Sequence, residues 1–172
     1  MENYVWLFPV LFIFHDMEEI IGMGAWLQKN GKMLDKRFPK ISGSFAHYST
    51  EGMALAVFEE LLVCIAICIL SLCLDWYALW LGGLIAYTVH LAVHIVQAVV
   101  VRMYLPALAT SMIALPVSVL LIKKCMVLLQ FTAGEAVLYG IIGLMLIALN
   151  LKFAHRLMRW YTVRLGGCRI EK

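Results

Sequence analysis

Charged side chains are scarce in this sequence. Asp, Glu, Lys and Arg together make up 15% of the 172 residues, whereas apolar types make up 63%. A soluble globular chain carries about 25% charged residues. The mean hydropathy of +0.89 also leaves too few polar side chains to cover the surface of a small soluble fold. The composition therefore excludes an ordinary soluble domain and predicts an integral membrane protein.

The sequence also lacks the usual marks of several other protein classes. Its five cysteines form no Cys-x-x-Cys pair, and three of them lie in one apolar stretch, so we expect reduced thiols packed as small hydrophobic groups. The first apolar stretch has no basic leader and no small-residue cleavage site, so we expect it to stay on the mature protein. The net charge is only +3, and the basic residues are spread over loops and helix ends, so no nucleic-acid partner is expected.

Five apolar stretches account for most of the chain, and each is close to the roughly 20 residues that a helix needs to span a bilayer. We predict an all-α fold, an integral membrane bundle of about five transmembrane helices that forms one domain over residues 1–172. A polar and basic loop, 28–50, separates the first two helices. The predicted helices cover residues 3–27, 52–73, 76–101, 104–124 and 132–157.

The basic residues predict an orientation. If the loop 28–50 is cytoplasmic, only Lys123 and Lys124 of the fourteen Lys and Arg residues lie outside. Short cytoplasmic loops carry an excess of such residues. We therefore expect the N-terminus outside, the C-terminus inside, and a multi-pass protein of a bacterial-type cytoplasmic membrane.

Ionisable side chains at membrane depth cost at least ~2.5–3.5 kcal/mol each on insertion scales, and they usually mark function. In the stretch 3–27, His15, Glu18 and Glu19 share one helix face because their spacing is i, i+3 and i+4. In the stretch 76–101, His90 and His94 are one turn apart on a stripe of small and polar residues. Both groups predict side chains that face the interior of the bundle.

Two further helices carry polar groups at a similar depth. Glu59 and Glu60 point ~100° apart on their helix, and we favour Glu60 as the group that faces inward. Asn150 shares a face with Tyr139 and Gly143. The predicted topology places all of these groups in one layer of the cytoplasmic half. The candidate metal ligands are His15, Glu18, Glu19, Glu59, Glu60, His90 and His94, and the candidate catalytic residues are Glu19, Glu60 and Asn150.

Imidazoles and carboxylates together suit iron, manganese or zinc, and a divalent cation offsets the cost of burying carboxylates. Di-iron bundles supply glutamates and Glu-x-x-His pairs from four helices. The spacing here differs from that motif, so a dinuclear centre is supported by analogy only. The zinc-protease pattern His-Glu-x-x-His is absent as well. The expected cofactor is a divalent metal, either iron in a centre of one or two ions, or zinc.

The segment His15-Asp16-Met17-Glu18-Glu19 resembles the signature of the HXXEE family of small integral membrane proteins. The resemblance implies a metal-binding or catalytic role for His15, Glu18 and Glu19. It implies no particular substrate.

The expected function is that of a metal-dependent membrane enzyme that acts on a lipid or another apolar small molecule, by iron-dependent oxidation or by zinc-dependent hydrolysis. One alternative is a metal-free isomerase that uses Glu and His as acid and base, with a layout that resembles the emopamil-binding sterol isomerases. Another is a small proton-coupled transporter. The polar layer also has a purely structural interpretation, as hydrogen bonds between helices. The expected partners are membrane lipids, and the sequence leaves a homodimer open.

Overall fold

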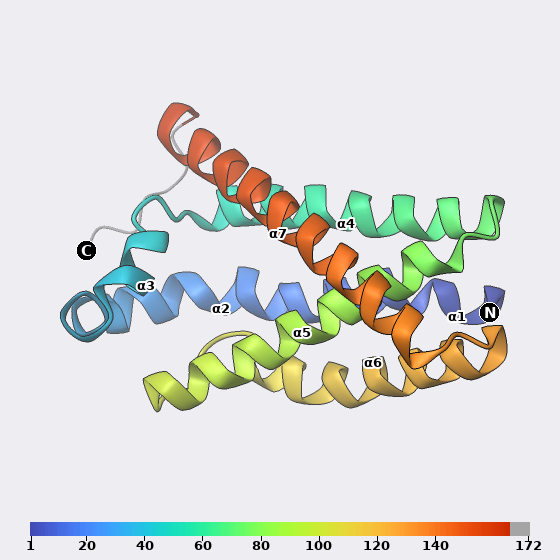
Figure 1. The fold of residues 1–172 in the computed structure, drawn as a ribbon. Helices are drawn as coiled ribbons and strands as arrows, with labels where there is room; N and C mark the ends of the chain where they lie inside the picture. Colours follow the sequence, from blue (N-terminus) through green and yellow to red (C-terminus); the bar gives the residue numbers. More distant parts are fainter. Residues whose placement is uncertain (166–172) are drawn as a thin grey trace.

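The computed structural model describes residues 1–165, and all of its regular structure is helical, as the sequence predicts. Figure 1 shows the helices as a bundle of long rods with short connections. The helices are α1 (Glu2–Val5), α2 (Leu7–Arg37), α3 (Pro39–Ser44), α4 (Thr50–Cys73), α5 (Tyr77–Val101), α6 (Leu108–Leu129) and α7 (Ala133–Arg164).

The long helices α2, α4, α5, α6 and α7 run along the bundle, and the chain reverses its direction between one and the next (Figure 1). The helix α5 packs against α6 and α7, while α4 packs against α7 and α2. The N-terminus and the end of α7 lie at opposite ends of the bundle. Side chains at the middle of α2, α4 and α5 therefore lie at a similar height along the bundle axis.

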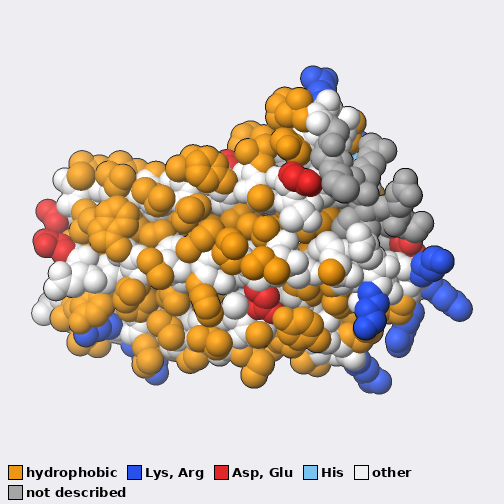
Figure 2. Space-filling view, turned by 180° about the vertical axis from the view of Figure 1, so that it is seen from behind, with side chains coloured by type: hydrophobic (Ala, Val, Ile, Leu, Met, Phe, Trp, Pro, Cys, Tyr) orange, Lys and Arg blue, Asp and Glu red, His pale blue; other side chains and the backbone are white. Residues whose placement is uncertain are grey.

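Four helices, α4, α5, α6 and α7, are long and apolar enough to cross a membrane. Large apolar side chains cover much of their outer surface, as Figure 2 shows for one face. A surface of this kind is suited to lipid rather than to water. The chain is thus a multi-pass membrane protein. The remaining long helix, α2, differs because it carries acidic residues in its middle.

The first predicted helix is longer than expected. It continues as α2 to Arg37 rather than ending at residue 27, and the short helix α3 follows within the predicted loop 28–50. The segment after residue 27 contains no proline before Pro39, and a proline disfavours helical backbone at the residue before it. Phe38 accordingly leaves the helical conformation, with φ −137°.

The fourth predicted helix is shifted along the chain. The helix α6 begins at Leu108 rather than at residue 104, because the loop between α5 and α6 contains Pro106 and ends at Ala107 in a left-handed conformation. The helix continues to Leu129. The fifth predicted helix also extends further than expected, since α7 runs to Arg164 rather than to residue 157.

Ala107 has φ 91° and ψ −16°, and it is fully buried. A side chain with a Cβ atom pays roughly 1–3 kcal/mol for this conformation, which glycine adopts without strain. We expect Ala107→Gly to raise the free energy of unfolding by about 1 kcal/mol, measured by thermal unfolding of the purified protein in detergent. Ala114→Gly in the interior of α6 should instead lower it by about 1 kcal/mol. A lower stability of Ala107→Gly would contradict the strained backbone.

Candidate metal centre

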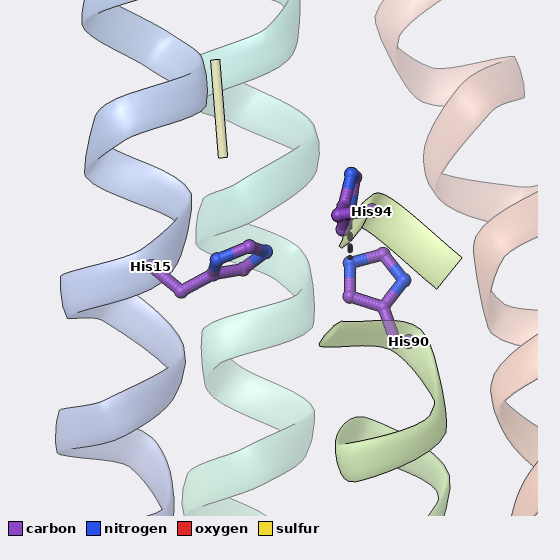
Figure 3. Close-up of side chains that lie close together, drawn as sticks. All are labelled: His15, His90 and His94. Atoms are coloured by element: carbon purple, nitrogen blue, oxygen red, sulfur yellow. Dashed lines mark hydrogen bonds between the residues drawn. The ribbon is translucent and has the colours of Figure 1, made fainter. Parts of the chain in front are cut away.

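Three histidines from two helices meet in the middle of the bundle. His15 of α2 extends toward His90 and His94 of α5, as Figure 3 shows. One ligand nitrogen from each ring lies within 4.8 Å of the other two. The ring centroids are 4.4 Å apart for His90 and His94, and 5.0 Å apart for His15 and His94. This cluster can hold a metal ion.

Glu19 joins this cluster from α2. Its Oε1 lies 3.2 Å from Nε2 of His94, and the same Nε2 lies 2.9 Å from Nε2 of His90. A neutral imidazole nitrogen carries either one proton or one lone pair, so it cannot satisfy both neighbours fully. The three polar atoms therefore converge on a small region that a cation would satisfy better than hydrogen bonds do.

Burial makes this arrangement costly without a partner ion. His15 has no exposed surface, and Glu19 is 7% exposed. The Nε2 of His15 has no hydrogen-bond partner among the described residues. Buried polar atoms without partners are rare in proteins, and each calls for a physical explanation. Metal ligation by the Nε2 lone pair would provide one.

The two glutamates of α4 take different positions. Glu60 lines the same cavity as Glu19 and His94. Glu59 instead accepts a hydrogen bond of 3.3 Å from Nδ2 of Asn150 on α7. Of this adjacent pair, Glu60 is thus the residue that lines the cavity beside the histidines. Asn150 lines the same cavity and also contacts Glu59.

Glu18 is the second named residue of the motif, and its carboxylate reaches from α2 to the start of α6. Its carboxylate accepts hydrogen bonds from Tyr104, from the backbone of Ala109 and from both the backbone and the hydroxyl of Thr110. The hydrogen bond to this carboxylate, followed by partial burial, raises the pKa of Tyr104 to about 12. Tyr104 therefore remains a proton donor at neutral pH. Glu18 is fully engaged there, next to the histidine cluster rather than within it.

Two residues near the cluster were not among the predicted ligands. Asp16 is 3% exposed, lines the cavity, and has no partner for its Oδ2 among the described residues. Its position in an apolar stretch was a signal that sequence reasoning could have used. Thr110 gave no such signal, because a threonine in an apolar helix commonly bonds to its own backbone.

A cavity of about 960 Å³ extends from the histidine cluster between the helices. Most of its lining side chains are apolar, and they come from α2, α3, α4, α5 and α7. The polar exceptions near the cluster are Asp16, Glu19, Glu60, His90, His94, Gln97 and Asn150. A largely apolar cavity with a few convergent polar groups is the usual form of a small-molecule site.

These features define a multi-pass membrane protein with a partly buried histidine cluster that can hold a metal ion. The chain belongs to the family described as proteins of unknown function with an HXXEE motif, whose pattern it matches over residues 6–121. The matched segment contains the motif, Glu60, Thr110 and both histidines of α5, whereas Asn150 lies beyond it. No curated protein and no solved structure matches the chain.

Proposed function

We propose that this protein is a metal-dependent enzyme of the membrane, and that it hydrolyses a lipid or another apolar substrate at a zinc ion held by His15, His90 and His94. The observation that carries the proposal is the convergence of three imidazoles, of which that of His15 is buried and has a nitrogen without a partner among the described residues. Catalytic zinc sites use three protein ligands and leave the fourth position for water or substrate.

The spacing of the nitrogens supports a single ion. In a tetrahedral site with Zn–N distances of about 2.05 Å, the ligand nitrogens lie about 3.3 Å apart. The nitrogens of His90 and His94 are 2.9 Å apart, and all three nitrogens lie within 4.8 Å of one another. A small approach of the His15 ring would complete the site. Only one carboxylate, that of Glu19, forms an ion-pair contact with a histidine among the described residues.

Glu19 is the proposed general base. Its carboxylate lies beside His94 and also lines the cavity, so it can accept a proton from the attacking water and deliver it to the leaving group. The metal ion, when bound, supplies Lewis-acid activation of water and of the substrate. Asp16 and Glu60 line the same cavity and offer further positions for a proton.

The apolar lining of the cavity favours a substrate with a hydrocarbon portion. Tyr87, Cys64 and Ile67 line it near the middle of the bundle, while Ile41 and Phe45 line the end near α3. Each CH₂ group moved from water into such a lining gains about 0.8 kcal/mol. A lipid already in the bilayer would bring the reacting group to Glu19 without passing through bulk water.

The proposed setting is a cytoplasmic membrane of bacterial type, with α2 as a fifth spanning helix. Lys and Arg side chains gather at one end of the molecule (Figure 2), around the end of α2 and the end of α7. By the positive-inside rule, we place this end in the cytoplasm, which puts the N-terminus outside. The acidic residues of α2 then lie among neighbouring helices, where ionisable groups in membranes are usually found.

A second candidate is an iron-dependent oxidation of the same class of substrate. The presence of Asp16 and Glu60 near the histidines favours it, because iron accepts mixed sets of imidazole and carboxylate ligands. The two candidates share the three histidines and differ in the ion. Identification of the metal separates them.

Metal analysis tests the proposal directly. Protein purified without added chelator is expected to contain about one zinc ion per chain by mass spectrometry. Removal of the ion should lower the midpoint of thermal unfolding, because a ligand that binds only the folded state stabilises it. Readdition of zinc should restore the midpoint, whereas magnesium, which prefers oxygen ligands, should not.

The other outcomes are informative. Iron with a characteristic paramagnetic resonance signal would favour the oxidase. Protein that turns over a lipid after complete removal of metal would overturn the proposal and favour the metal-free isomerase. Substrate uptake by proteoliposomes without any turnover would favour the transporter.

A further inference from the structure

Glu18 caps a helix other than its own. The backbone nitrogen of Thr110 lies 2.8 Å from its Oε2, and that of Ala109 lies 3.4 Å from its Oε1. The residue at the start of α6, Ala107, has no side chain that could accept these bonds. A carboxylate is well suited to this position because the first N–H groups of a helix lack partners within it and carry partial positive charge.

The loop that precedes α6 is held on the same face of α2. One turn after Glu18, Gly22 packs against Pro106, and a Cβ at this glycine would lie 3.1 Å from the proline ring. One turn further, the indole nitrogen of Trp26 donates to the carbonyl of Tyr104 over 2.7 Å. Three successive turns of α2 thus fix where α6 begins, and with it the position of Thr110.

The Thr110 hydroxyl lies between His15 and Glu18, the first and the second named residues of the motif. Its Oγ1 is 2.6 Å from Oε2 of Glu18 and 3.1 Å from Nδ1 of His15. The Glu18 carboxylate already accepts two backbone N–H groups, so it acts as an acceptor. A hydroxyl has a single proton. The Thr110 hydroxyl therefore donates it over the shorter contact, to the Glu18 carboxylate.

In its contact with His15, the Thr110 hydroxyl must then be the acceptor. With its proton directed to Glu18, the hydroxyl oxygen can only accept from His15, so Nδ1 of His15 carries the ring proton. The Ser111 hydroxyl lies 3.5 Å from the same Nδ1 and offers a second, longer acceptor for that proton. Nε2 is left with a lone pair. This is the nitrogen that is buried and has no hydrogen-bond partner among the described residues.

We propose that Glu18 and Thr110 are positioning residues that hold His15 in its Nδ1-protonated form and direct its Nε2 lone pair toward His90 and His94. Metal-ligating histidines typically donate their other N–H group to a fixed acceptor, which sets the tautomer and the ring orientation. The two glutamates of the motif then have separate roles. Glu18 acts through Thr110, and Glu19 acts in the cluster itself. The consequence for metal binding rests on the proposed function, but the tautomer does not.

The tautomer can be read without any metal. In metal-free, full-length protein labelled with ¹⁵N-histidine, the nitrogen shifts of His15 are expected to report a proton on Nδ1, with the resonance assigned by its loss in His15→Gln. Thr110→Val removes the nearer acceptor, leaves only the longer contact to Ser111, and should weaken this preference. Thr110→Ser keeps the hydroxyl and should restore it. A proton on Nε2 of His15 in the unaltered protein would overturn the proposal.

Metal affinity provides the second measurement. Thr110→Val should weaken zinc binding about 10- to 100-fold in competition with a chelator, and Thr110→Ser should recover it to within a few fold. Thr88→Val is the matched control, because the single hydrogen bond of the Thr88 hydroxyl within residues 1–165 goes to a carbonyl of its own helix, that of Leu84. We expect it to leave zinc affinity unchanged. Unaltered affinity in Thr110→Val would also overturn the proposal.

Glu18→Gln tests whether Glu18 positions His15 through Thr110 or binds the metal itself. Glutamine can keep its carbonyl oxygen toward Thr110 and turn its amide toward the Tyr104 hydroxyl. It loses the 3.4 Å bond from the Ala109 backbone but keeps the contact to Thr110, so we expect zinc affinity within a few fold of normal. Loss of zinc as complete as in His94→Ala would identify Glu18 as a ligand instead. If the tautomer is as proposed but the unaltered protein binds no metal, the proposed enzymatic function fails and the positioning role stands.

Discussion

His94→Ala is expected to abolish both metal retention and activity. His94 contacts the other groups of the proposed centre at its Nε2, with His90 at 2.9 Å and Glu19 at 3.2 Å. Its removal takes away one ligand and also the partner of a buried carboxylate. Loss of an outer partner of a metal ligand alone costs about 10- to 100-fold in affinity, so we expect a loss of more than about 100-fold. Equilibrium dialysis with zinc measures it, and His90→Ala should behave in the same way.

His155→Ala is the matched control for this substitution. His155 is exposed on α7, and its Nδ1 contacts a carbonyl of its own helix, that of Leu151, at 2.7 Å. His155 also lines the cavity, but no contact joins it to the histidine cluster among the described residues, so we expect this variant to retain metal and most of the activity. The reverse pattern, with metal lost in His155→Ala and kept in both α5 variants, would move the site to the end of the bundle near α3.

Gly143→Ala is expected to have the largest effect on folding. At Gly143 of α7, an added Cβ would overlap the carbonyl group of Gly82 on α5. Small residues allow membrane helices to approach this closely, and the rigid backbone of α5 cannot yield as a flexible side chain would. We expect the free energy of unfolding to fall by about 3 kcal/mol or more, measured by unfolding in detergent with helix content as the signal.

The same substitution at Gly134 tests whether crowding is the cause. Gly134 lies in the first turn of α7, and a Cβ there would approach nothing closer than the Thr132 hydroxyl at 4.0 Å. Gly134→Ala should therefore leave stability unchanged or raise it slightly. Similar destabilisation by both substitutions would mean that a general effect on α7, rather than its contact with α5, is responsible.

Much of the fold follows from the sequence because the lipid environment favours helices in the long apolar stretches. Apolar stretches of sufficient length must satisfy their backbone groups internally in lipid, and a helix does so within one segment. Family membership was also predictable, since the motif is local and its residues lie within five positions. Helix ends were harder to predict, because the end of α2 at Arg37 depends on the position of Pro39 rather than on hydropathy.

The convergence of His15 with His90 and His94 was predictable as well, because helical periodicity places each group on one face and topology places both at one depth. The sequence by itself thus determined the helices, the family and a buried layer of histidine and glutamate. Only the tertiary structure decided which neighbours the two glutamates of the motif, Glu18 and Glu19, contact. Adjacent residues on a helix point ~100° apart, and which neighbour each one meets depends on packing. Glu18 meets the start of α6, and Glu19 meets His94, because the loop before α6 is held against one face of α2 and α5 lies against another.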